Sequence, residues 1–252
     1  MNKQDIAQAL LKISHTPCHN EWQRHRYNLT RDFLQRDPED FMDFQAIKET
    51  MFVGNAEYTF EQYKEMRDAI TLDSIMDRDI FSQNHQHPAY ATTGNTIHHR
   101  YHLFMLDKLC ACKAEDCNSI LELGGGYGNM ARIIWKMGFT GEYSIVDLPE
   151  FIVLQDYYLS HHGILVNWQA DLARHYDLFI ATWSLSEIPL EDRAPYEKLD
   201  VDYFLLAYGP NYAEIKNHDY FQHFVSCYPD HSFVLLEAPH QTDQYYLVGE
   251  PK

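Results

Sequence analysis

The spacing of hydrophobic positions changes about halfway along the chain. Apolar side chains recur every three or four residues over positions 6–13 and 58–70, which predicts amphipathic helices. Positions 82–95 are polar, with His and Gly among them, which predicts a loop, and a further helical pattern follows over positions 96–109. Residues 1–112 are therefore predicted to form a helical N-terminal region that covers the substrate or forms an oligomer surface.

Short apolar runs typical of strands alternate with helical patterns after residue 112. Five β/α units predict a doubly wound, mostly parallel sheet, and the short connection between the last two runs predicts a terminal hairpin. The expected fold is α/β, with a Rossmann-like, seven-stranded, mostly parallel sheet over residues 113–252 and a helical N-terminal extension. The seven predicted strands are 119–123, 143–146, 164–166, 177–182, 201–208, 232–236 and 245–248.

The segment after the first predicted strand carries the most specific chemistry. Glycines crowd positions 124–128 between a strand and a helix, so a ligand can lie against bare backbone there. The dinucleotide fingerprint begun at Gly124 requires a glycine at position 129, where this chain has Asn129. Glu122, at the strand end, is unfavourable beside a pyrophosphate but complements a ligand with an ammonium group and a sulfonium centre. These residues favour S-adenosylmethionine over NAD.

Two further acids follow later strands. Asp147 lies at the end of the second predicted strand, 23 residues after Gly124, where an acid commonly holds a ribose diol. The alternative is that Asp147 caps the following helix. Asp171 follows the third predicted strand and is either an adenine contact or a solvated loop acid. The predicted cofactor contacts are Glu122, Gly124, Gly125, Gly126, Gly128, Asp147, Leu148, Asp171, Leu172 and Thr182.

Three blocks of sequence resemble a known family. Positions 120–129 (ILELGGGYGN), 146–150 (VDLPE) and 177–187, which ends in SLSE, are similar to the sugar O-methyltransferase family of class I S-adenosylmethionine-dependent methyltransferases. The first block is common to the superfamily, and the other two narrow the resemblance, which covers roughly the second half of the chain. It implies a cofactor site at Glu122, Gly124, Gly126 and Asp147, and a sugar or sugar-nucleotide acceptor. Trp183 departs from the pattern, which has a smaller polar residue there, and this departure bears on the identity of the acceptor.

Candidate catalytic residues are Glu187, His98 and His99. Transfer of a methyl group to a hydroxyl is mainly a positioning task, aided by a base that accepts the hydroxyl proton. Glu187 follows the fourth predicted strand and is either that base or only a first-turn acid of the next helix. The two histidines are either bases suited to neutral pH or polar residues on a helix surface. Candidate acceptor contacts are Tyr90, Trp183, Tyr208 and Asn211.

The composition of the chain excludes some classes of binding partner. The chain of 252 residues has 37 acidic side chains against 20 Lys and Arg, a formal net charge of −17, which argues against nucleic acid or anionic membrane as a partner. No apolar run reaches about 18 residues, and no signal-peptide pattern is present, so we expect a cytoplasmic protein with no membrane insertion. The five cysteines are expected to be reduced, and the spacing of Cys110, Cys112 and Cys117 matches no zinc pattern, so no metal is predicted.

The leading hypothesis is an S-adenosylmethionine-dependent O-methyltransferase that acts on a hydroxyl of a small-molecule or glycan sugar, as a monomer or a homo-oligomer. Two alternatives stay open: a non-catalytic scaffold that binds S-adenosylmethionine, and a methyltransferase for a non-sugar small molecule. An NAD-dependent oxidoreductase is disfavoured by Glu122 and Asn129. No nucleophile elbow or zinc-protease helix motif is present, so hydrolase chemistry has no support.

Overall fold

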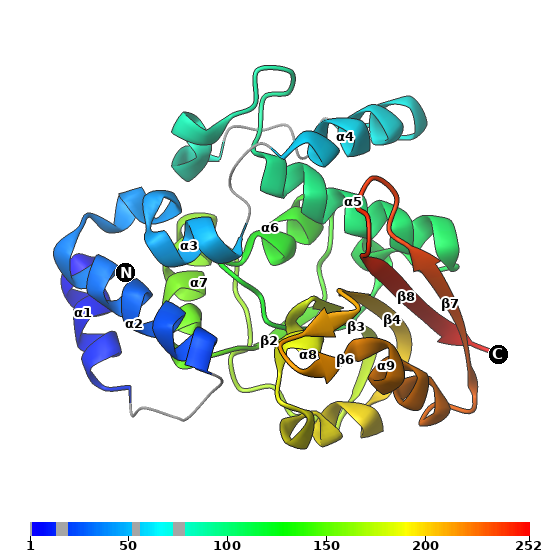
Figure 1. The fold of residues 1–252 in the computed structure, drawn as a ribbon. Coiled ribbons are helices and arrows are strands. Elements are labelled where there is room, and N and C mark those ends of the chain that lie inside the picture. Colours follow the sequence, from blue (N-terminus) through cyan, green and yellow to red (C-terminus); the bar gives the residue numbers. More distant parts are fainter. Residues whose placement is uncertain (1, 14–19, 52–55, 73–78) are drawn as a thin grey trace. The chain divides into compact units, whose positions relative to one another are not determined.

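The structure is a computed structural model that describes residues 2–13, 20–51, 56–72 and 79–252 (Figure 1). The chain divides into two compact units. The first, here called the helical unit, comprises Met1–Tyr101, Gly125–Met137 and Asp147–Leu165. The second, the sheet unit, comprises His102–Gly124, Gly138–Val146 and Val166–Lys252. The domain boundary expected at residue 112 stays a prediction.

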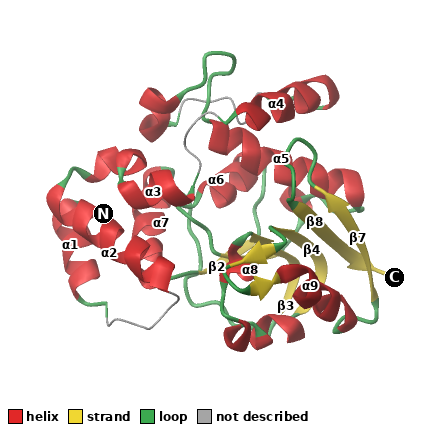
Figure 2. Ribbon diagram, viewed as in Figure 1, coloured by secondary structure: helices red, strands yellow, loops and turns green. Residues whose placement is uncertain are grey.

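The sheet unit contains the strands of the described residues, drawn in yellow in Figure 2. Helix α5 (Gly94–Leu109) begins in the helical unit and ends in the sheet unit. The strands are β1 (Ser119–Leu123), β2 (Glu142–Val146), β3 (His175–Thr182), β4 (Asp200–Tyr208), β5 (Asn211–Tyr212), β6 (Ile215–Lys216), β7 (His231–Glu237) and β8 (Tyr245–Pro251). The helices of the sheet unit are α8 (Ser184–Glu187), α9 (Asn217–Ser226) and the 3-10 segments η3 (Ala114–Asp116), η4 (Leu190–Asp192) and η5 (Ala194–Lys198).

The central sheet has six strands in the order β2-β1-β3-β4-β8-β7. Neighbours among β1 to β4 pair in parallel, whereas β8 pairs antiparallel with both β4 and β7. The mixed α/β, mostly parallel sheet and the terminal hairpin are therefore confirmed. Because the four parallel strands point the same way, their last residues, Leu123, Val146, Thr182 and Tyr208, lie along one edge, where ligands bind in open α/β sheets.

The third predicted strand, at residues 164–166, is wrong. This stretch is too short for a ladder, and only the next residue, Asn167, forms an isolated bridge, with Ser144 of β2. The N–H of Ile164 instead donates to the carbonyl of Leu159 in the last turn of the preceding helix, at 3.0 Å, beside Gly163 in the left-handed region. This arrangement terminates a helix. Leu165 is 86% exposed, so its apolar character does not mark a buried strand.

Aromatic side chains fill the core between the sheet and α9. Phe204 of β4 lies 5.8 Å from Phe224 of α9 and 4.7 Å from Tyr228, measured between ring centroids. Phe179 of β3 packs edge-on against Phe204 at 6.3 Å. Each of these rings is almost fully buried, so the apolar residues of β3, β4 and α9 are covered on this face of the sheet.

The helical unit is held by contacts between its N-terminal helices and a later one. Trp22 lies edge-on to Phe151 at 5.6 Å, and the buried guanidinium of Arg26 donates to Glu150 at 2.7 Å. Among the described helices, none is both long and apolar enough to cross a membrane. The helices of this unit are α1 (Lys3–Leu11), α2 (Asn20–Gln35), α3 (Gln45–Thr50), α4 (Glu57–Ala69), α6 (Asn129–Lys136), α7 (Pro149–His161) and the 3-10 segments η1 (Pro38–Asp43) and η2 (Ile80–His85).

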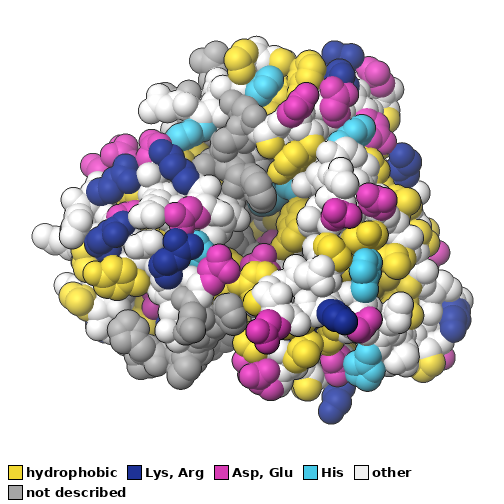
Figure 3. Space-filling model, viewed as in Figure 1, with side chains coloured by type: hydrophobic (Ala, Val, Ile, Leu, Met, Phe, Trp, Pro, Cys, Tyr) yellow, Lys and Arg dark blue, Asp and Glu magenta, His cyan; other side chains and the backbone are white. Residues whose placement is uncertain are grey.

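Acidic side chains occur at many separate places on the face shown in Figure 3, interspersed with Lys, Arg and His side chains. The acidic side chains visible on this face are thus spread over it and not gathered at a single spot.

Candidate functional site

The first half of the glycine turn belongs to the sheet unit and follows a buried acid. Glu122, in β1, is 3% exposed and accepts a hydrogen bond from the hydroxyl of Tyr143 in β2 at 2.9 Å. Burial, and then the charge of Glu122, raise the pKa of that hydroxyl well above its ordinary value, so Tyr143 keeps its proton and remains a donor. Glu122 is thus held at the carboxyl end of β1 by a specific partner.

Gly124 leaves β1 with a positive φ of 74°, a conformation that glycine adopts without strain. Its N–H donates to the carbonyl of Val146 at 2.8 Å, which extends the pairing of β1 with β2. A side chain at this position would overlap with the β-carbon of Ser184, whose hydroxyl donates to the carbonyl of Leu123. Close packing against Ser184 therefore requires glycine here, independently of any ligand.

The second half of the turn belongs to the helical unit and leads into α6. Gly126 and Gly128 also have positive φ, 61° and 96°, and Gly128 is the residue before the first turn of the helix. A β-carbon at position 128 would press on Leu159, whereas one at position 126 would meet only the flexible side chain of Met51, at 3.4 Å. In this half of the glycine turn, the backbone of Gly126 is thus covered only by the flexible side chain of Met51.

The carboxylate of Asp147 contacts the backbone of the second half of the glycine turn. Its carboxylate accepts from the N–H of Leu148 at 2.7 Å and from the amide of Gln155 in α7 at 2.6 Å. The backbone N–H groups of Gly125 and Gly126 also interact with it, and the same Gln155 amide donates to the carbonyl of Gly126 at 2.9 Å. Burial outweighs these hydrogen bonds and raises the pKa of Asp147 to about 7.

Gln155 also presents a buried acceptor. Its side-chain oxygen has no hydrogen-bond partner among the described residues, although its amide nitrogen makes two hydrogen bonds. A buried acceptor of this kind is costly unless a donor reaches it. A hydroxyl-bearing ligand beside Asp147 would supply such a donor.

The alternative role of Asp147 as a helix cap is not what the structure shows. Helix α7 begins at Pro149, with Leu148 as the residue before it, and no side chain caps that end. Pro149 occupies the first turn, where a proline lacks no needed N–H. The carboxylate of Asp147 therefore serves the glycine turn.

The end of β3 has an unusual backbone in the sheet unit. Trp183 follows Thr182, the last strand residue, with φ 66° and ψ −32°, a conformation rarely adopted by a residue with a side chain. Its N–H donates to the carbonyl of Ala207 at 2.7 Å, and its indole N–H donates to the side-chain oxygen of Gln244 at 2.8 Å. The indole also lies edge-on to His102, at 5.1 Å between ring centroids.

His102 extends this cluster. Its Nδ1 lies 2.7 Å from the hydroxyl of Tyr246 in β8, and the imidazole is fully buried. Trp183, His102, Gln244 and Tyr246 thus form a group of hydrogen-bonding rings and an amide beside the carboxyl ends of β3 and β4. We call it the Trp183 cluster.

The three candidate catalytic residues occupy different surroundings. Glu187 ends the short helix α8 in the sheet unit and is half-buried. His98 and His99 lie on α5 in the helical unit, where Nδ1 of His98 is 3.0 Å from Gln62 and Nδ1 of His99 is 3.3 Å from Asn129. Burial lowers the pKa of His98 to about 3, and burial and then Arg132 lower that of His99 to about 4. Both histidines are therefore neutral at pH 7 and poor proton acceptors, which weighs against either as the base.

The other predicted contacts lie in varied settings. Tyr90 is buried in the helical unit, with its hydroxyl 2.9 Å from that of Thr59. In the sheet unit, Tyr208 ends β4 and stacks on Phe221 at 4.1 Å, and Asn211 is exposed in β5. Asp171 is exposed and accepts from the N–H of Ala173 at 2.9 Å, while the next residue, Leu172, packs against the aromatic core.

Sequence patterns missed four residues that shape these places. Gln155 and Met51 flank the second half of the glycine turn, Ser184 packs on the first half, and Gln244 anchors Trp183. Ser184 and Gln244 each lie 61 residues from the group they contact, and Met51 is also far from Gly126 in the sequence. Gln155 lies 29 residues from Gly126 and 8 from Asp147. Only the block Ser-Leu-Ser-Glu, at residues 184–187, could have drawn attention to Ser184.

Comparisons with known proteins were made for the whole chain. Neither protein-family models nor curated proteins match the sequence. Among solved structures, the glycopeptide N-methyltransferase MtfA, solved with S-adenosyl-L-methionine, is 10% identical, covers 61% of this chain and 94% of its own, and has a TM-score of 0.47. The methyltransferase domain of bacterial CtHen1 is 14% identical over 61% of this chain and 96% of its own, with a TM-score of 0.46. An S-adenosylmethionine-dependent methyltransferase from Clostridium acetobutylicum is 11% identical over 52% of this chain and 83% of its own, with a TM-score of 0.42.

Proposed function

We propose that this chain is an S-adenosylmethionine-dependent methyltransferase that transfers a methyl group to a hydroxyl oxygen of a sugar or sugar-containing acceptor. The observation that carries the proposal is the glycine turn after β1, with the carboxylate of Asp147 closed onto its backbone. The resemblance of three sequence blocks to sugar O-methyltransferases supports the choice of acceptor.

The residues present fit the cofactor. Positive φ at Gly126 leaves its backbone accessible once Met51 moves, so an amino acid moiety can approach it closely. The carboxylate of Asp147 and the unpartnered oxygen of Gln155 are acceptors suited to a ribose diol. Glu122, at the end of β1, provides a negative charge before the turn that suits an ammonium group. The chain runs without a break from Glu122 through Gly124 into Gly125 and Gly126.

When bound, S-adenosylmethionine supplies an electrophilic methyl group on a sulfonium sulfur. The chain's own residues then have three tasks: to hold the cofactor, to align the acceptor hydroxyl, and to accept its proton as the new carbon–oxygen bond forms. Asp147 and Gln155 perform the first task and the Trp183 cluster the second. Glu187 is the proposed proton acceptor, because the low pKa values of His98 and His99 disfavour them.

The first experiment is calorimetric titration of the purified chain with S-adenosylhomocysteine. We expect saturable binding at one site, no binding of NAD, and loss of most of the affinity in Asp147→Ala. Asp68→Ala is the matched control, because Asp68 is an acid of α4 with a side chain that is 72% exposed, outside the predicted cofactor contacts, and its loss is expected to change affinity less. Folded protein that binds no S-adenosylhomocysteine would overturn the proposal.

The second experiment separates an enzyme from a scaffold. With a radiolabelled methyl donor and a panel of sugars and sugar nucleotides, we expect transfer by the wild-type chain. Glu187→Gln is expected to lower turnover by ~10²–10⁴-fold, the usual contribution of a general base, while leaving S-adenosylhomocysteine affinity unchanged. His99→Gln is the control and is expected to keep most of the activity. Cofactor binding without transfer to any acceptor would favour the non-catalytic scaffold. Transfer only to non-sugar acceptors would favour a methyltransferase for a non-sugar small molecule.

A further inference from the structure

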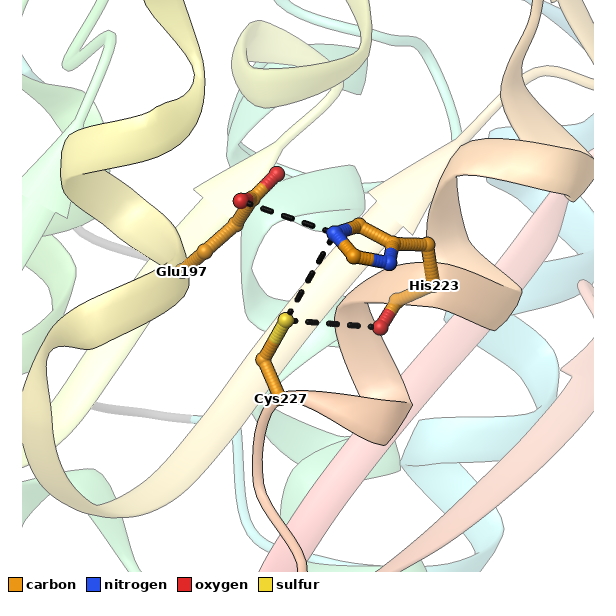
Figure 4. Close-up of side chains that lie close together, drawn as sticks. All are labelled: Glu197, His223 and Cys227. Carbon is orange, nitrogen blue, oxygen red and sulfur yellow. Dashed lines mark hydrogen bonds and ion pairs between the residues drawn. The ribbon is translucent and has the colours of Figure 1, made fainter.

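Three side chains with metal-binding atoms lie together in the sheet unit, away from the strand ends discussed above. His223 and Cys227 are one helical turn apart at the carboxyl end of α9, and Glu197 comes from η5, which precedes β4 (Figure 4). In Figure 4 the imidazole lies between the carboxylate and the thiol, and all three functional groups converge. Two separate elements thus present an oxygen, a nitrogen and a sulfur to one point.

The distances match those between ligands of a tetrahedral metal ion. Nε2 of His223 lies 3.7 Å from a carboxylate oxygen of Glu197 and 3.7 Å from the sulfur of Cys227. The three ligand atoms lie within 4.8 Å of one another. Bonds of about 2.3 Å to sulfur and about 2.0 Å to nitrogen and oxygen, at tetrahedral angles, separate the donors by about 3.3–3.6 Å. Only a small closing movement is needed.

We propose that Glu197, His223 and Cys227 form a Zn²⁺ site with three protein ligands and a fourth position open to water. A thiolate with an imidazole is a donor set that suits Zn²⁺, whereas Mg²⁺ and Ca²⁺ require oxygen ligands. The site does not depend on the proposed methyltransferase activity, because it uses none of the residues assigned to it.

The ion can reach these ligands from solvent. The side chain of His223 is 61% exposed and that of Glu197 is 18% exposed. Glu197 and Cys227 also line a surface hollow of about 320 Å³, together with Asp230 and His231. An open fourth position is therefore compatible with the surroundings, and the ion would link α9 to η5.

Binding displaces a proton. When the bond between Sγ and the ion forms, the thiol proton passes to solvent, and the imidazole binds through its neutral form.

A second group of potential ligands in the sheet unit makes a useful contrast. His175, Asp177 and Asp202 also lie within ligand distance of one another. However, the carboxylate of Asp177 accepts hydrogen bonds from the backbone and side chain of Asn118, at 2.6 and 3.1 Å, and from Ser119 at 3.2 Å. That group also lacks a thiol. It supplies a matched control with an imidazole and two carboxylates but no thiolate.

The test uses Co²⁺ as a spectroscopic substitute for Zn²⁺ on the reduced, metal-free, full-length chain. We expect one equivalent of Co²⁺ to give a thiolate-to-cobalt charge-transfer band and the visible bands of a tetrahedral ion, and Zn²⁺ to displace it. Cys227→Ser is expected to remove the charge-transfer band. Even the loss of a group that only orients a ligand costs ~10–100-fold in metal affinity, so His223→Gln and Glu197→Gln are each expected to weaken Zn²⁺ binding by at least ~10-fold.

Two controls decide where the ion binds. His175→Gln tests the second group, and Cys117→Ser tests the neighbouring thiols of Cys112 and Cys117, whose sulfurs are 3.8 Å apart. Both variants are expected to bind like the wild type, and Zn²⁺ is expected to raise their melting temperatures but not that of His223→Gln, which alters an exposed side chain. The proposal is overturned if the wild type gives no thiolate band, or if the band survives in Cys227→Ser.

Discussion

The two units of this molecule handle buried polar groups in different ways. In the helical unit, Asp79 is almost fully buried with its charge compensated by Arg132, His162 and Tyr158, and Arg132 in turn donates to Asn129. In the sheet unit, by contrast, the interior beneath β3 and β4 is filled mainly by aromatic rings such as Phe179, Phe204 and Phe224. The buried charged groups of this unit, Glu122 and Arg193, form hydrogen bonds with neutral side chains, those of Tyr143 and Asn217.

This difference has a physical consequence for stability. An aromatic core tolerates an apolar substitution that conserves volume, because shape and burial are kept. A buried charge tolerates the loss of its partner poorly, because the remaining charge cannot be solvated. The helical unit should therefore be the more sensitive of the two to substitution of a single polar residue.

The largest effect is expected for Asp79→Asn. Burial disfavours the carboxylate, but His162, Arg132 and Tyr158 outweigh burial and lower the pKa of Asp79. Loss of the negative charge removes an ionic partner from the buried Arg132, so we expect the free energy of unfolding to fall by about 3–5 kcal/mol in urea titrations at pH 7. Since the folded-state pKa lies below the unfolded value of about 3.9, this contribution is present above about pH 4 and is lost as the pH falls through the folded-state pKa.

Asp177→Asn in the sheet unit is the control for that prediction. Asp177 accepts hydrogen bonds from Asn118 and Ser119 but is partly exposed, so water can replace a lost partner. We expect a loss of about 1–2 kcal/mol. Equal losses in the two variants would contradict the proposed contrast between the units.

The next largest effect is expected at Gly124. An alanine there must adopt a positive φ and must also displace Ser184, so Gly124→Ala should destabilise the chain by about 2–4 kcal/mol. Adding Ser184→Gly should recover the steric part but not the backbone part. Gly138→Ala isolates the backbone part, because Gly138 has φ 110° with no atom within 4 Å of an added β-carbon; thermal unfolding should show a loss of about 1–2 kcal/mol. A loss at Gly124 no larger than that at Gly138 would show that Ser184 yields without cost.

The sheet unit was far easier to predict from sequence than the helical unit. Strands β1, β3 and β4 are continuous apolar runs, and the glycines that follow β1 mark the turn, so local pattern was sufficient. The network around Asp79 joins residues up to 83 positions apart, and no local pattern identifies such partners. Gln155 was missed for a different reason: it lies only 8 residues after Asp147, but an amide on a helix carries no pattern that identifies its hydrogen-bond partner.

At residues 164–166 the error was of the opposite kind, because the sequence predicted a strand that the structure does not contain. Three apolar residues after a helix can either begin a strand or complete a helix end, and length alone could not distinguish the two. The hydrogen bond from Ile164 to Leu159 decides the matter, because residues 164–166 complete the helix end and only Asn167, the next residue, pairs with β2.

A smaller effect, on binding, is expected from the titration of Asp147. Its pKa of about 7 means that the carboxylate form grows between pH 6 and pH 8. If the cofactor's ribose hydroxyls bind that form, the affinity for S-adenosylhomocysteine should rise ~10-fold over this interval, from the titration of one group. The contribution of Asp147 to stability changes in the opposite sense: it is fully present below about pH 4 and is lost as the pH rises through about 7.

Calorimetry at several pH values checks the binding prediction, with Asp147→Asn as the control that should show no such rise. A wild-type affinity that does not change between pH 6 and pH 8 would show that the proton on Asp147 does not compete with the ligand.

The smallest effect is expected at Trp183, where the sheet unit does contain a specific polar contact. Trp183→Phe keeps an aromatic ring beside His102 but removes the indole N–H that donates to Gln244. A single hydrogen bond of this kind contributes about 0.5–1.5 kcal/mol, so the free energy of unfolding should fall by about that amount. Trp183→Gly should instead relieve the strain of the positive φ while removing the ring. If the indole positions the acceptor, this variant should lose more turnover than stability. A Trp183→Phe variant as unstable as Asp79→Asn would mean that the sheet unit also depends on a buried polar network, and would remove the distinction between the two units.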